Sequence, residues 1–397
     1  MSAPHADLVA RTRAAPDEVD LLGLAGRDGV LHVRAGIGLA GRGVAARVAV
    51  AHAAALLATI DHDDEVQSAG TGAVAFGALP FHPDPSAELI VPEVVWGVAD
   101  DGTRWVTTIG TDQDRPPDQA LPVPTRVEVA PVRPPEWWCE LVARATEAIR
   151  TSGPDGLSKV VLARELLAGA DAPFDRARVL ARLRDAYPDC FVFHVDGFLG
   201  ASPELLVGRS GDLVRAQPMA GTAPRGADPA ADAELATALM ASTTYRREHQ
   251  ITIDMVYDTL LPWCSYLDYE AEPSVVGMAN VQHLATLVEG RLSQPAPSIL
   301  ELVEALHPTP AVCGWPRAEA RRWIEAHEGF DRGRYAGTVG WVDAKGNGTW
   351  AVSIRCAEVH GTTARLYAGN GIVVDSDPAT ELAETEAKLS AMLSALG

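Results

Sequence analysis

The chain has 397 residues, of which 47% are hydrophobic, so it is long enough to bury a large core. Its formal charge of −20, from 53 acidic and 33 basic residues, opposes binding to nucleic acid or to an anionic membrane through a general electrostatic field. An anionic small molecule would therefore need a local cationic or metal site.

The five cysteines are scattered, odd in number and without Cys-x-x-Cys spacing. They predict buried thiols in a reducing compartment rather than a disulfide or zinc framework. The N-terminal residues do not have the pattern of a signal peptide, because charged residues interrupt them. The most apolar run, Val48–Ile60, contains His52 and is too short to span a membrane. We therefore expect a soluble cytoplasmic protein.

Residues 1 to about 115 are predicted to be β-rich with one helix, and no catalytic constellation is visible in them. The expected strands are Gly29–Arg34, Gly70–Phe81 (with its turn), Leu89–Val98 and Arg104–Ile109, and the expected helix is Val44–Ile60. We interpret this part as scaffold. The Pro-rich residues 115–135 indicate a connector, and a helix is expected over Glu136–Ser152.

The strand expected over Leu157–Glu165 contains Lys159 just before an apolar run. A lysine at the start of a buried strand is unusual. If the side chain is desolvated, its pKa falls and it can act as a base. The alternative is an ordinary strand-end lysine that reaches solvent.

Glu204 directly follows Pro203, where a turn re-enters an apolar strand. A carboxylate in apolar surroundings has a raised pKa and can donate a proton, although a glutamate at a strand edge is an equally simple interpretation. Further on, Gly221 and Thr222 in the Gly/Pro loop Ala216–Gly226 could present N–H groups and a hydroxyl to an anion. The loop is not a Walker A loop, because no Gly-Lys-Ser/Thr follows, and an ordinary turn remains the alternative.

A long helical segment is predicted over Asp232–Leu261, and Glu248 within it is a candidate carboxylate ligand or a surface glutamate. Its Glu-His pair does not have the His-Glu-x-x-His spacing of zinc sites. His283, just before an expected strand, and His307, in a proline-punctuated loop, are single histidines, which are more often structural than catalytic. An Arg-rich helix is expected after that loop.

Two hairpin strands are expected at Thr338–Val342 and Trp350–Ala357, and the second places Arg355 inside an apolar strand. A buried arginine needs an acidic partner or an anionic ligand. The sequence therefore predicts that Arg355 either forms a core ion pair or binds an anion.

The last thirty residues contain a strand end, Gly371–Val374, and then a helix that Asp377 caps. One stripe of this helix faces the core, and the residues of that stripe are Leu382, Leu389, Leu393 and Leu396. Glu381, Glu384 and Lys388 lie three and four residues apart, so their side chains converge. They form either a solvated face or part of a site for a hard cation, which prefers oxygen ligands.

Singly, each of these features has an ordinary structural explanation, but together they resemble the chorismate-utilising enzymes, and within them the isochorismate synthases. The matching segments are Ser158–Arg164, Gly200–Glu204, Ala220–Gly226, Arg246–Ile251, His307–Ala311, Tyr335–Gly337, Ile354–Cys356 and Glu381–Lys388. They span the chain from about Lys159 to the C-terminus. The first 115 residues match only loosely, chiefly through Gly77–Phe81.

The resemblance implies a single α/β (α+β) domain over residues 1–397, with two stacked, mostly antiparallel sheets flanked by helices. Residues 1–135 would be the β-rich scaffold part and residues 136–397 the chorismate-binding part. The resemblance further implies Mg²⁺ held by Glu248 and Glu384, with Glu381 in an outer position. The substrate-binding residues that it implies are Gly221, Thr222, His283, Ala311, Tyr335, Arg355, Gly369 and Lys388.

The chemistry implied is the conversion of chorismate to isochorismate. Lys159 would deprotonate a water that attacks C2, and Glu204 would protonate the departing C4 hydroxyl. The Mg²⁺ would grip the ring carboxylate, while Arg355 and Tyr335, helped by the Gly369 N–H, would take the enolpyruvyl carboxylate. We expect chorismate as the partner, no nucleic acid or membrane, and a monomer or weak homodimer. Whether the product enters menaquinone, siderophore or another pathway stays open.

One departure from the family pattern concerns the metal. Thr244 and Tyr245 stand where relatives usually carry a lysine followed by an acid, so an outer carboxylate is missing and weaker Mg²⁺ binding is predicted. Asn370, where relatives often have alanine, is a milder difference.

Four alternatives remain. Anthranilate synthases lack the lysine at Lys159, and aminodeoxychorismate synthases typically have Pro-Ile-Lys-Gly-Thr where this chain has Pro-Met-Ala-Gly-Thr. Salicylate synthases tend to carry threonine at the position of Ala311. A chorismate-binding pseudoenzyme is supported only by Thr244 and Tyr245.

Overall fold

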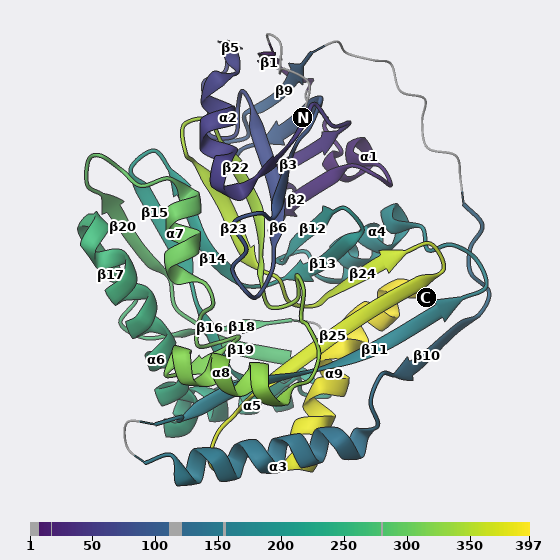
Figure 1. Ribbon diagram of the computed structural model, residues 1–397, viewed down its shortest axis with the longest axis vertical. Helices are drawn as coiled ribbons and strands as arrows, with labels where there is room; N and C mark the ends of the chain where they lie inside the picture. Colours follow the sequence, from purple (N-terminus) through teal and green to yellow (C-terminus); the bar gives the residue numbers. More distant parts are fainter. Residues whose placement is uncertain (1–7, 17, 111–120, 154–155, 279–280) are drawn as a thin grey trace.

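The computed structural model describes residues 8–16, 18–110, 121–153, 156–278 and 281–397. Its described strands form two large sheets and one small sheet, with helices around them (Figure 1). The predicted architecture of large, mostly antiparallel sheets flanked by helices is confirmed, and β1 with β5 is the one parallel ladder among the described strands. Residues 115–120 of the predicted connector lie outside the described residues.

The first large sheet has thirteen strands. Its order is β10 (Val127–Pro131), β11 (Lys159–Ala170), β25 (Thr363–Ile372), β24 (Cys356–His360), β13 (Phe198–Ser202), β12 (Phe191–Val195), β2 (Val30–Arg34), β3 (Ile37–Arg42), β8 (Val94–Val98), β9 (Arg104–Ile109), β1 (Val9–Ala14) and β5 (Asp61–Asp64), with β21 (Gly314–Trp315) beside β11. Strands from the first 110 residues therefore pair with strands from the rest of the chain.

The second large sheet has nine strands, and the small sheet has three. The nine-stranded order is β17 (Cys264–Tyr269), β20 (Val288–Leu292), β15 (Leu213–Gln217), β14 (Leu205–Ser210), β23 (Gly348–Val352), β22 (Thr338–Asp343), β6 (Val74–Leu79), β7 (Glu88–Val91) and β4 (Ala46–Ala49). The small sheet is β16 (Met219–Pro224), β19 (Val281–Ala285) and β18 (Ser274–Gly277).

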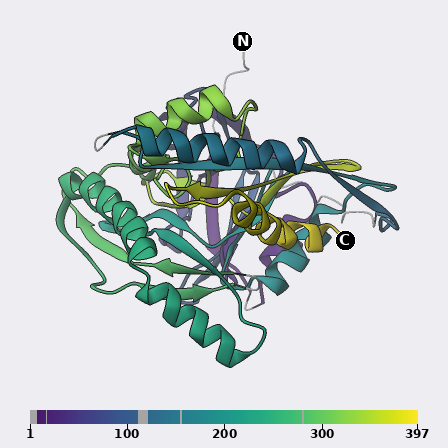
Figure 2. The same cartoon turned by 90° about the horizontal axis from the view of Figure 1, so that it is seen from below.

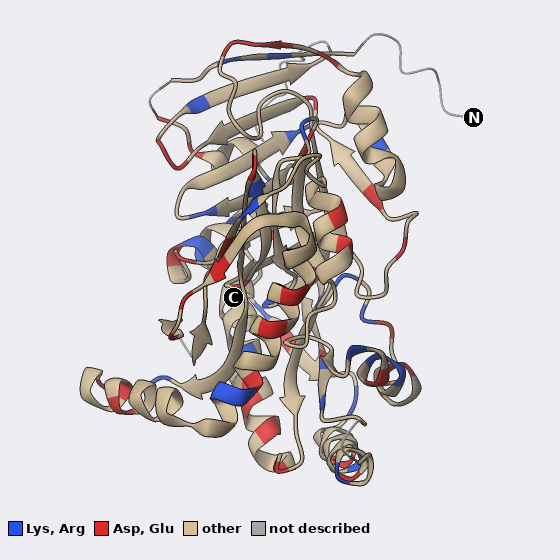
Figure 3. Cartoon of the chain, turned by 90° about the vertical axis from the view of Figure 1, so that its left-hand side faces the viewer, with Lys and Arg blue, Asp and Glu red and all other residues tan. Residues whose placement is uncertain are grey.

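The helices of the described chain lie around these sheets. They are α1 (Leu21–Ala25), α2 (Ala53–Thr59), α3 (Pro135–Thr151), α4 (Arg176–Ala186), α5 (Pro229–Ala241), α6 (Thr243–Leu260), α7 (Ile299–Leu306), α8 (Arg317–His327) and α9 (Pro378–Leu396), with 3₁₀ turns at Val50–His52 and Leu261–Trp263. None of the described helices is long and apolar enough to cross a membrane. Acidic and basic residues are both distributed over several helices, strands and loops of the ribbon (Figure 3).

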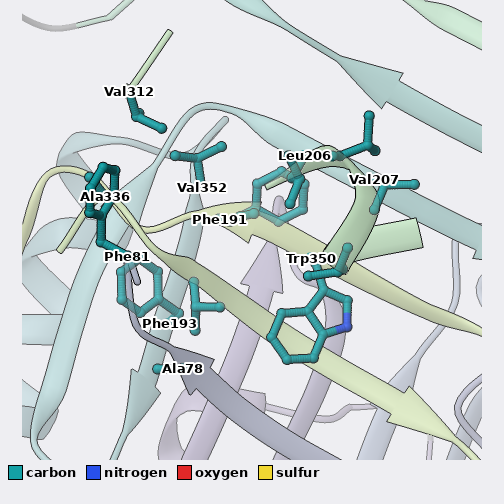
Figure 4. Close-up of a cluster of buried hydrophobic side chains, with 14 of the residues drawn as sticks. Ala78, Phe81, Phe191, Phe193, Leu206, Val207, Val312, Ala336, Trp350 and Val352 are labelled. Carbon is teal, nitrogen blue, oxygen red and sulfur yellow. The ribbon is translucent and has the colours of Figure 1, made fainter. Parts of the chain in front are cut away.

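One core joins the two large sheets. Phe193 on β12 and Trp350 on β23 belong to opposite sheets, and both are completely buried in the same cluster (Figure 4). A second cluster fills the space between the other face of the thirteen-stranded sheet and helices α1, α4 and α9. Helix α9 also lies beside α3, as the view from below shows (Figure 2). Because α9 is packed on two sides, its polar stripe has a fixed position.

Several local predictions are wrong. Residues 44–60 form β4 before α2, because Ala46–Ala49 pairs with β7 and this tertiary pairing overrides the helical composition. The helix expected over Asp232–Leu261 is two helices, since Ser242 is extended (ψ 115°) and caps α6 through the Tyr245 N–H. His283, expected just before a strand, is itself in β19 (Val281–Ala285).

Two further corrections affect the site. The Gly/Pro loop predicted over Ala216–Gly226 contains β16, which pairs with β19. Arg355 is not inside a strand, because β23 ends at Val352 and β24 begins at Cys356. Its backbone has φ 52°, a conformation that costs energy for a residue with a side chain. The surrounding strands must hold Arg355 in place.

Candidate active site

A cavity of about 530 Å³ opens where β11, β25 and the small sheet meet the first turns of α6 and α9. Every residue predicted for the site except Lys159 lines this cavity. These residues are Glu204, Gly221, Thr222, Glu248, His283, Ala311, Tyr335, Arg355, Gly369, Glu381, Glu384 and Lys388. Residues that are as much as 184 positions apart in the sequence, Glu204 and Lys388, therefore share one space.

Lys159 lies directly behind the wall of the cavity. Its Nζ donates a hydrogen bond to Glu248 Oε1 at 2.7 Å, and its side chain is only 5% exposed. Gly371, which lines the cavity, allows this approach, because a Cβ there would lie 2.6 Å from Lys159 Cε. The lysine of β11 is therefore buried, as predicted for the functional interpretation, and it is held by an ion pair.

Glu204 presents a protonated carboxyl group at neutral pH. The residue is 3% exposed, and burial raises its pKa from 4.5 to about 8. The backbone N–H of Met219 and the charges of Lys159 and Arg355 lower this pKa, but the increase caused by desolvation is larger. No ion pair involves Glu204 within the described chain. The carboxyl can therefore donate a proton into the cavity.

Arg355 is a cation without an ion-pair partner among the described carboxylates. Its Nη2 donates to His283 Nε2 at 3.3 Å, and Nδ1 of that histidine lies 3.1 Å from the Gly221 carbonyl oxygen. Burial, Arg355 and Lys388 lower the pKa of His283 to about 3, so the imidazole is neutral and can accept from Arg355. The guanidinium is thus oriented by a neutral group and remains available to an anion.

Gly221 is the bulge residue of β16. The register of β16 with β19 shifts at this position, and Gly221 has φ 73°. A Cβ would also lie 3.2 Å from Tyr245 Cβ. The backbone conformation strongly favours glycine here, and a side chain would also have to displace Tyr245 slightly.

Tyr335 closes another side of the cavity. Its ring stacks on Tyr367 with 5.0 Å between centroids, and burial raises the pKa of its hydroxyl. A Cβ on Gly369 would lie 2.8 Å from the Tyr335 oxygen, so that hydroxyl sits directly beside the Gly369 backbone. A neutral O–H donor therefore lines the cavity together with Arg355.

The first turns of α9 bring the acidic stripe to the cavity. Lys388 Nζ bonds Glu384 Oε1 at 2.5 Å, the Asn370 side-chain oxygen at 2.8 Å and the Gly369 carbonyl at 2.9 Å. Burial raises the pKa of Glu381 and lowers that of Lys388. The stripe of Glu381, Glu384 and Lys388 is therefore partly buried, and its side chains form a network of hydrogen bonds and an ion pair instead of a solvated face.

The donors present suit a hard divalent cation, although they are not gathered around one point. Glu248, Glu381 and Glu384 offer carboxylate oxygens, which Mg²⁺ prefers. As they stand, no three acidic, histidine or cysteine side chains in the described ranges are close enough to ligate one ion. Glu248 and Glu384 each use one oxygen for a lysine and keep the other without a partner in the described structure. Those two oxygens are the available ligands.

Tyr245 lines the cavity on the same face of α6 as Glu248. Burial raises the pKa of its phenol, and the charges of Glu384, Glu248 and Glu381 raise it further. The phenol therefore faces the three carboxylates as a neutral group. Thr244 and Tyr245 are the positions at which the sequence analysis expects an outer carboxylate in relatives, and here a phenol lies beside the carboxylates instead.

The sequence analysis did not predict three positions that hold the walls or the carboxylates of the cavity. Asn370 and Ser376 hold the Glu381 carboxylate, at 2.9 Å to Oε2 and 2.7 Å to Oε1. Asn370 had been noted only as a difference from relatives; its position as the polar residue between two glycines of a buried strand could have indicated its role. Ser376 lies beside the capping Asp377, and nothing in the sequence separates its role from capping.

Arg332 is the third position that the sequence analysis did not predict. It is 1% exposed and pairs with Glu328, and it donates to the carbonyl oxygens of Val161 at 2.7 Å and Val312 at 3.0 Å. Both valines line the cavity. This buried pair therefore joins two of its walls, and only long-range contacts reveal that role.

Comparisons with known proteins agree on one family. The family model described as "Chorismate binding enzyme" matches residues 43–397. A relative named putative isochorismate synthase MenF, from Mycobacterium tuberculosis, is 41% identical over 342 residues, which covers 83% of this chain and 87% of the relative.

Two solved structures are similar over nearly their whole length. One, described as a putative 2,3-dihydroxybenzoate-specific isochorismate synthase, DhbC, from Bacillus anthracis, has a TM-score of 0.79 and 34% identity, and the match covers 95% of this chain and 98% of that one. The other, MenF, the menaquinone-specific isochorismate synthase from Escherichia coli, has a TM-score of 0.82 and 26% identity, covering 98% and 95%.

Proposed function

The chain belongs to the chorismate-binding enzyme family, and from this premise we propose that it is an isomerase that converts chorismate to isochorismate. In this reaction a water oxygen bonds to C2 of the ring, the ring double bonds shift, and the C4 hydroxyl leaves. The formula of the molecule does not change. The site must therefore supply one proton acceptor for the attacking water and one proton donor for the leaving hydroxyl.

Glu204 is the proposed proton donor. Its pKa of about 8, which burial causes, keeps the carboxyl protonated at neutral pH. Protonation of the C4 oxygen turns a poor leaving group into water. The burial of this carboxyl in the cavity wall, with no ion-pair partner among the described residues, is the observation that supports the proposal most directly, because such an acid keeps a proton that it can donate.

Lys159 is the proposed base for the attacking water. Its side chain packs against Gly371 at the wall of the cavity, and Glu204 lines the same cavity. The ion pair with Glu248 at 2.7 Å must open, and the ammonium must release a proton, before Lys159 can accept one. The role of Lys159 thus depends on what else Glu248 binds.

The two substrate carboxylates have different proposed partners. The unpaired guanidinium of Arg355 and the hydroxyl of Tyr335 take the enolpyruvyl carboxylate, with the Gly369 backbone beside them. The free oxygens of Glu248 and Glu384 would hold Mg²⁺, with Glu381 in an outer position. When bound, the ion would neutralise the ring carboxylate and polarise it. The remaining lining residues, among them Thr222 and Ala311, shape the cavity.

The cysteines bear on the cellular setting of the protein. All five cysteines are free thiols, which supports a reducing compartment such as the cytoplasm. We propose a monomer or weak homodimer, which light scattering at several concentrations would check.

Incubation of the purified protein with chorismate and Mg²⁺, followed by chromatography, tests the function. Formation of isochorismate, in equilibrium with chorismate, is the expected result. Salicylate with pyruvate, an amino product that needs ammonium, or unchanged chorismate would replace the proposal by a salicylate synthase, an ammonia-using enzyme or a pseudoenzyme.

A further inference from the structure

Asn370 lies at the centre of the polar network that joins β25 to α9. It stands between Gly369 and Gly371 and is 2% exposed. Its Nδ2 donates to the Glu381 backbone oxygen at 2.7 Å and to Glu381 Oε2 at 2.9 Å, and its Oδ1 accepts from Lys388 Nζ at 2.8 Å. Every hydrogen-bonding atom of the side chain therefore contacts one of two residues that line the cavity.

The orientation of this amide follows from the chemistry of its partners. Lys388 has only donors, so it must face the amide oxygen. The backbone oxygen and the Oε2 atom of Glu381 are acceptors, so they must face the amide nitrogen. The reverse orientation would place N–H groups against the ammonium and an oxygen against the carboxylate. No aliphatic or carboxylate side chain of similar size can serve both neighbours.

The network leaves Glu381 and Lys388 with almost no freedom. Glu381 Oε1 accepts from Ser376 at 2.7 Å, and Oε2 accepts from Asn370, so both carboxylate oxygens of Glu381 are bound by neutral donors. The ammonium of Lys388 has three donors, and these meet Asn370, Gly369 and Glu384. All three donors of Lys388 are therefore bound within the protein, and the ion pair with Glu384 orients the Glu384 carboxylate. Asn370 supports Glu381 directly and Glu384 through Lys388.

We propose that Asn370 is a positioning residue that fixes the Glu381 and Glu384 carboxylates for the divalent cation. The inference rests on the proposed function, because that function assigns the cation to Glu248 and Glu384. Residues that orient metal ligands typically change metal affinity by about 10–100-fold when they are replaced. Asn370 does not line the cavity, so its replacement should leave the affinity for chorismate at saturating Mg²⁺ nearly unchanged.

The experiment compares Mg²⁺ binding of the full-length protein and three variants by calorimetry with Mg²⁺ alone, and then by kinetics with chorismate. N370A removes both contacts. N370D keeps an acceptor for Lys388 but places a second carboxylate against Glu381. N347A is the matched control, because Asn347 is also buried, donates to Asp343 at 2.9 Å and accepts from the Gly211 N–H at 2.7 Å, away from the cavity.

The expected result is a Mg²⁺ dissociation constant about 10–100-fold higher in N370A, at least as high in N370D, and within about twofold of wild type in N347A. KM for chorismate at saturating Mg²⁺ should stay within about threefold. A merely structural role would lower the melting temperature of N370A and N347A alike and leave Mg²⁺ affinity unchanged in both.

Two outcomes would overturn the inference. If wild type binds Mg²⁺ and N370A or N370D binds it equally well, Asn370 does not position the ligands while the metal assignment stands. If wild type neither binds Mg²⁺ nor needs it for turnover, the metal assignment itself fails and the role of Asn370 fails with it.

Discussion

Replacing Glu204 by glutamine should stabilise the protein while it abolishes most activity. The folded-state pKa of about 8 exceeds the ordinary value of 4.5, and each pKa unit corresponds to about 1.4 kcal/mol. Because the folded pKa is raised, the contribution of the neutral carboxyl is fully present below pH 4.5 and is lost as the pH rises towards 8. Between these pH values only the unfolded state ionises, and this lowers the free energy of unfolding of the wild type. The reduction is about 3 kcal/mol at pH 7 and about 5 kcal/mol above pH 8. The E204Q variant lacks this loss.

Urea unfolding followed by tryptophan fluorescence at pH 5, 6, 7 and 8 measures the effect. The stability of E204Q minus that of wild type should rise by about 1.4 kcal/mol for each pH unit in this range. The exposed Glu304, replaced by glutamine, is the matched control and should give a flat difference. A flat difference for E204Q would refute the interpretation that Glu204 is buried and protonated.

Further outcomes are expected from the same geometry. E204Q should lower kcat by about 10²–10⁴-fold, and kcat/KM of wild type should fall as the pH rises above about 8, where Glu204 loses its proton; a pH–rate profile checks this. K159M should lower kcat by a similar factor, measured by chromatography, and wild-type turnover would exclude Lys159 as the base. R355K should raise KM for chorismate about tenfold or more, because lysine cannot reproduce the planar fork; an unchanged KM would place the enolpyruvyl carboxylate elsewhere. Chelation with EDTA should abolish turnover, and because Thr244 and Tyr245 supply no acid, a Mg²⁺ titration should not saturate in the low micromolar range.

Local sequence signals were sufficient where short-range chemistry decides the structure. Asp377 caps α9 by accepting from the Thr380 N–H, as the Asp-Pro pair predicts. The apolar run after Lys159 is indeed a buried strand. The stripe of Glu381, Glu384 and Lys388 follows from helical spacing alone. These features depend on neighbours within about four residues, which the sequence displays directly.

The remaining features depend on contacts that the sequence does not display. Ala46–Ala49 becomes a strand because β7 offers an unpaired edge, and Gly221 becomes a bulge because β19 lies beside it. The left-handed conformation of Arg355 is imposed by the junction between β23 and β24. The ion pair of Lys159 with Glu248 joins β11 to α6 across 89 positions. Spacing suggested that each residue was unusual, but only the fold decides which of them meet.

The charges of the cavity support the proposal that an anionic substrate binds together with a divalent cation and beside a neutral Glu204. Lys159 and Lys388 are each paired with a carboxylate, so Arg355 is the cation left without an ion-pair partner among the described residues. Glu381 adds a further carboxyl, and the chain as a whole carries −20. Chorismate brings two carboxylates into this setting, so one guanidinium cannot balance them. An ionised Glu204 would add another negative charge beside the ring. Loss of the Glu204 proton above about pH 8 should therefore weaken chorismate binding as well as proton transfer, and calorimetric titration of chorismate at pH 7 and 9 would separate the two effects.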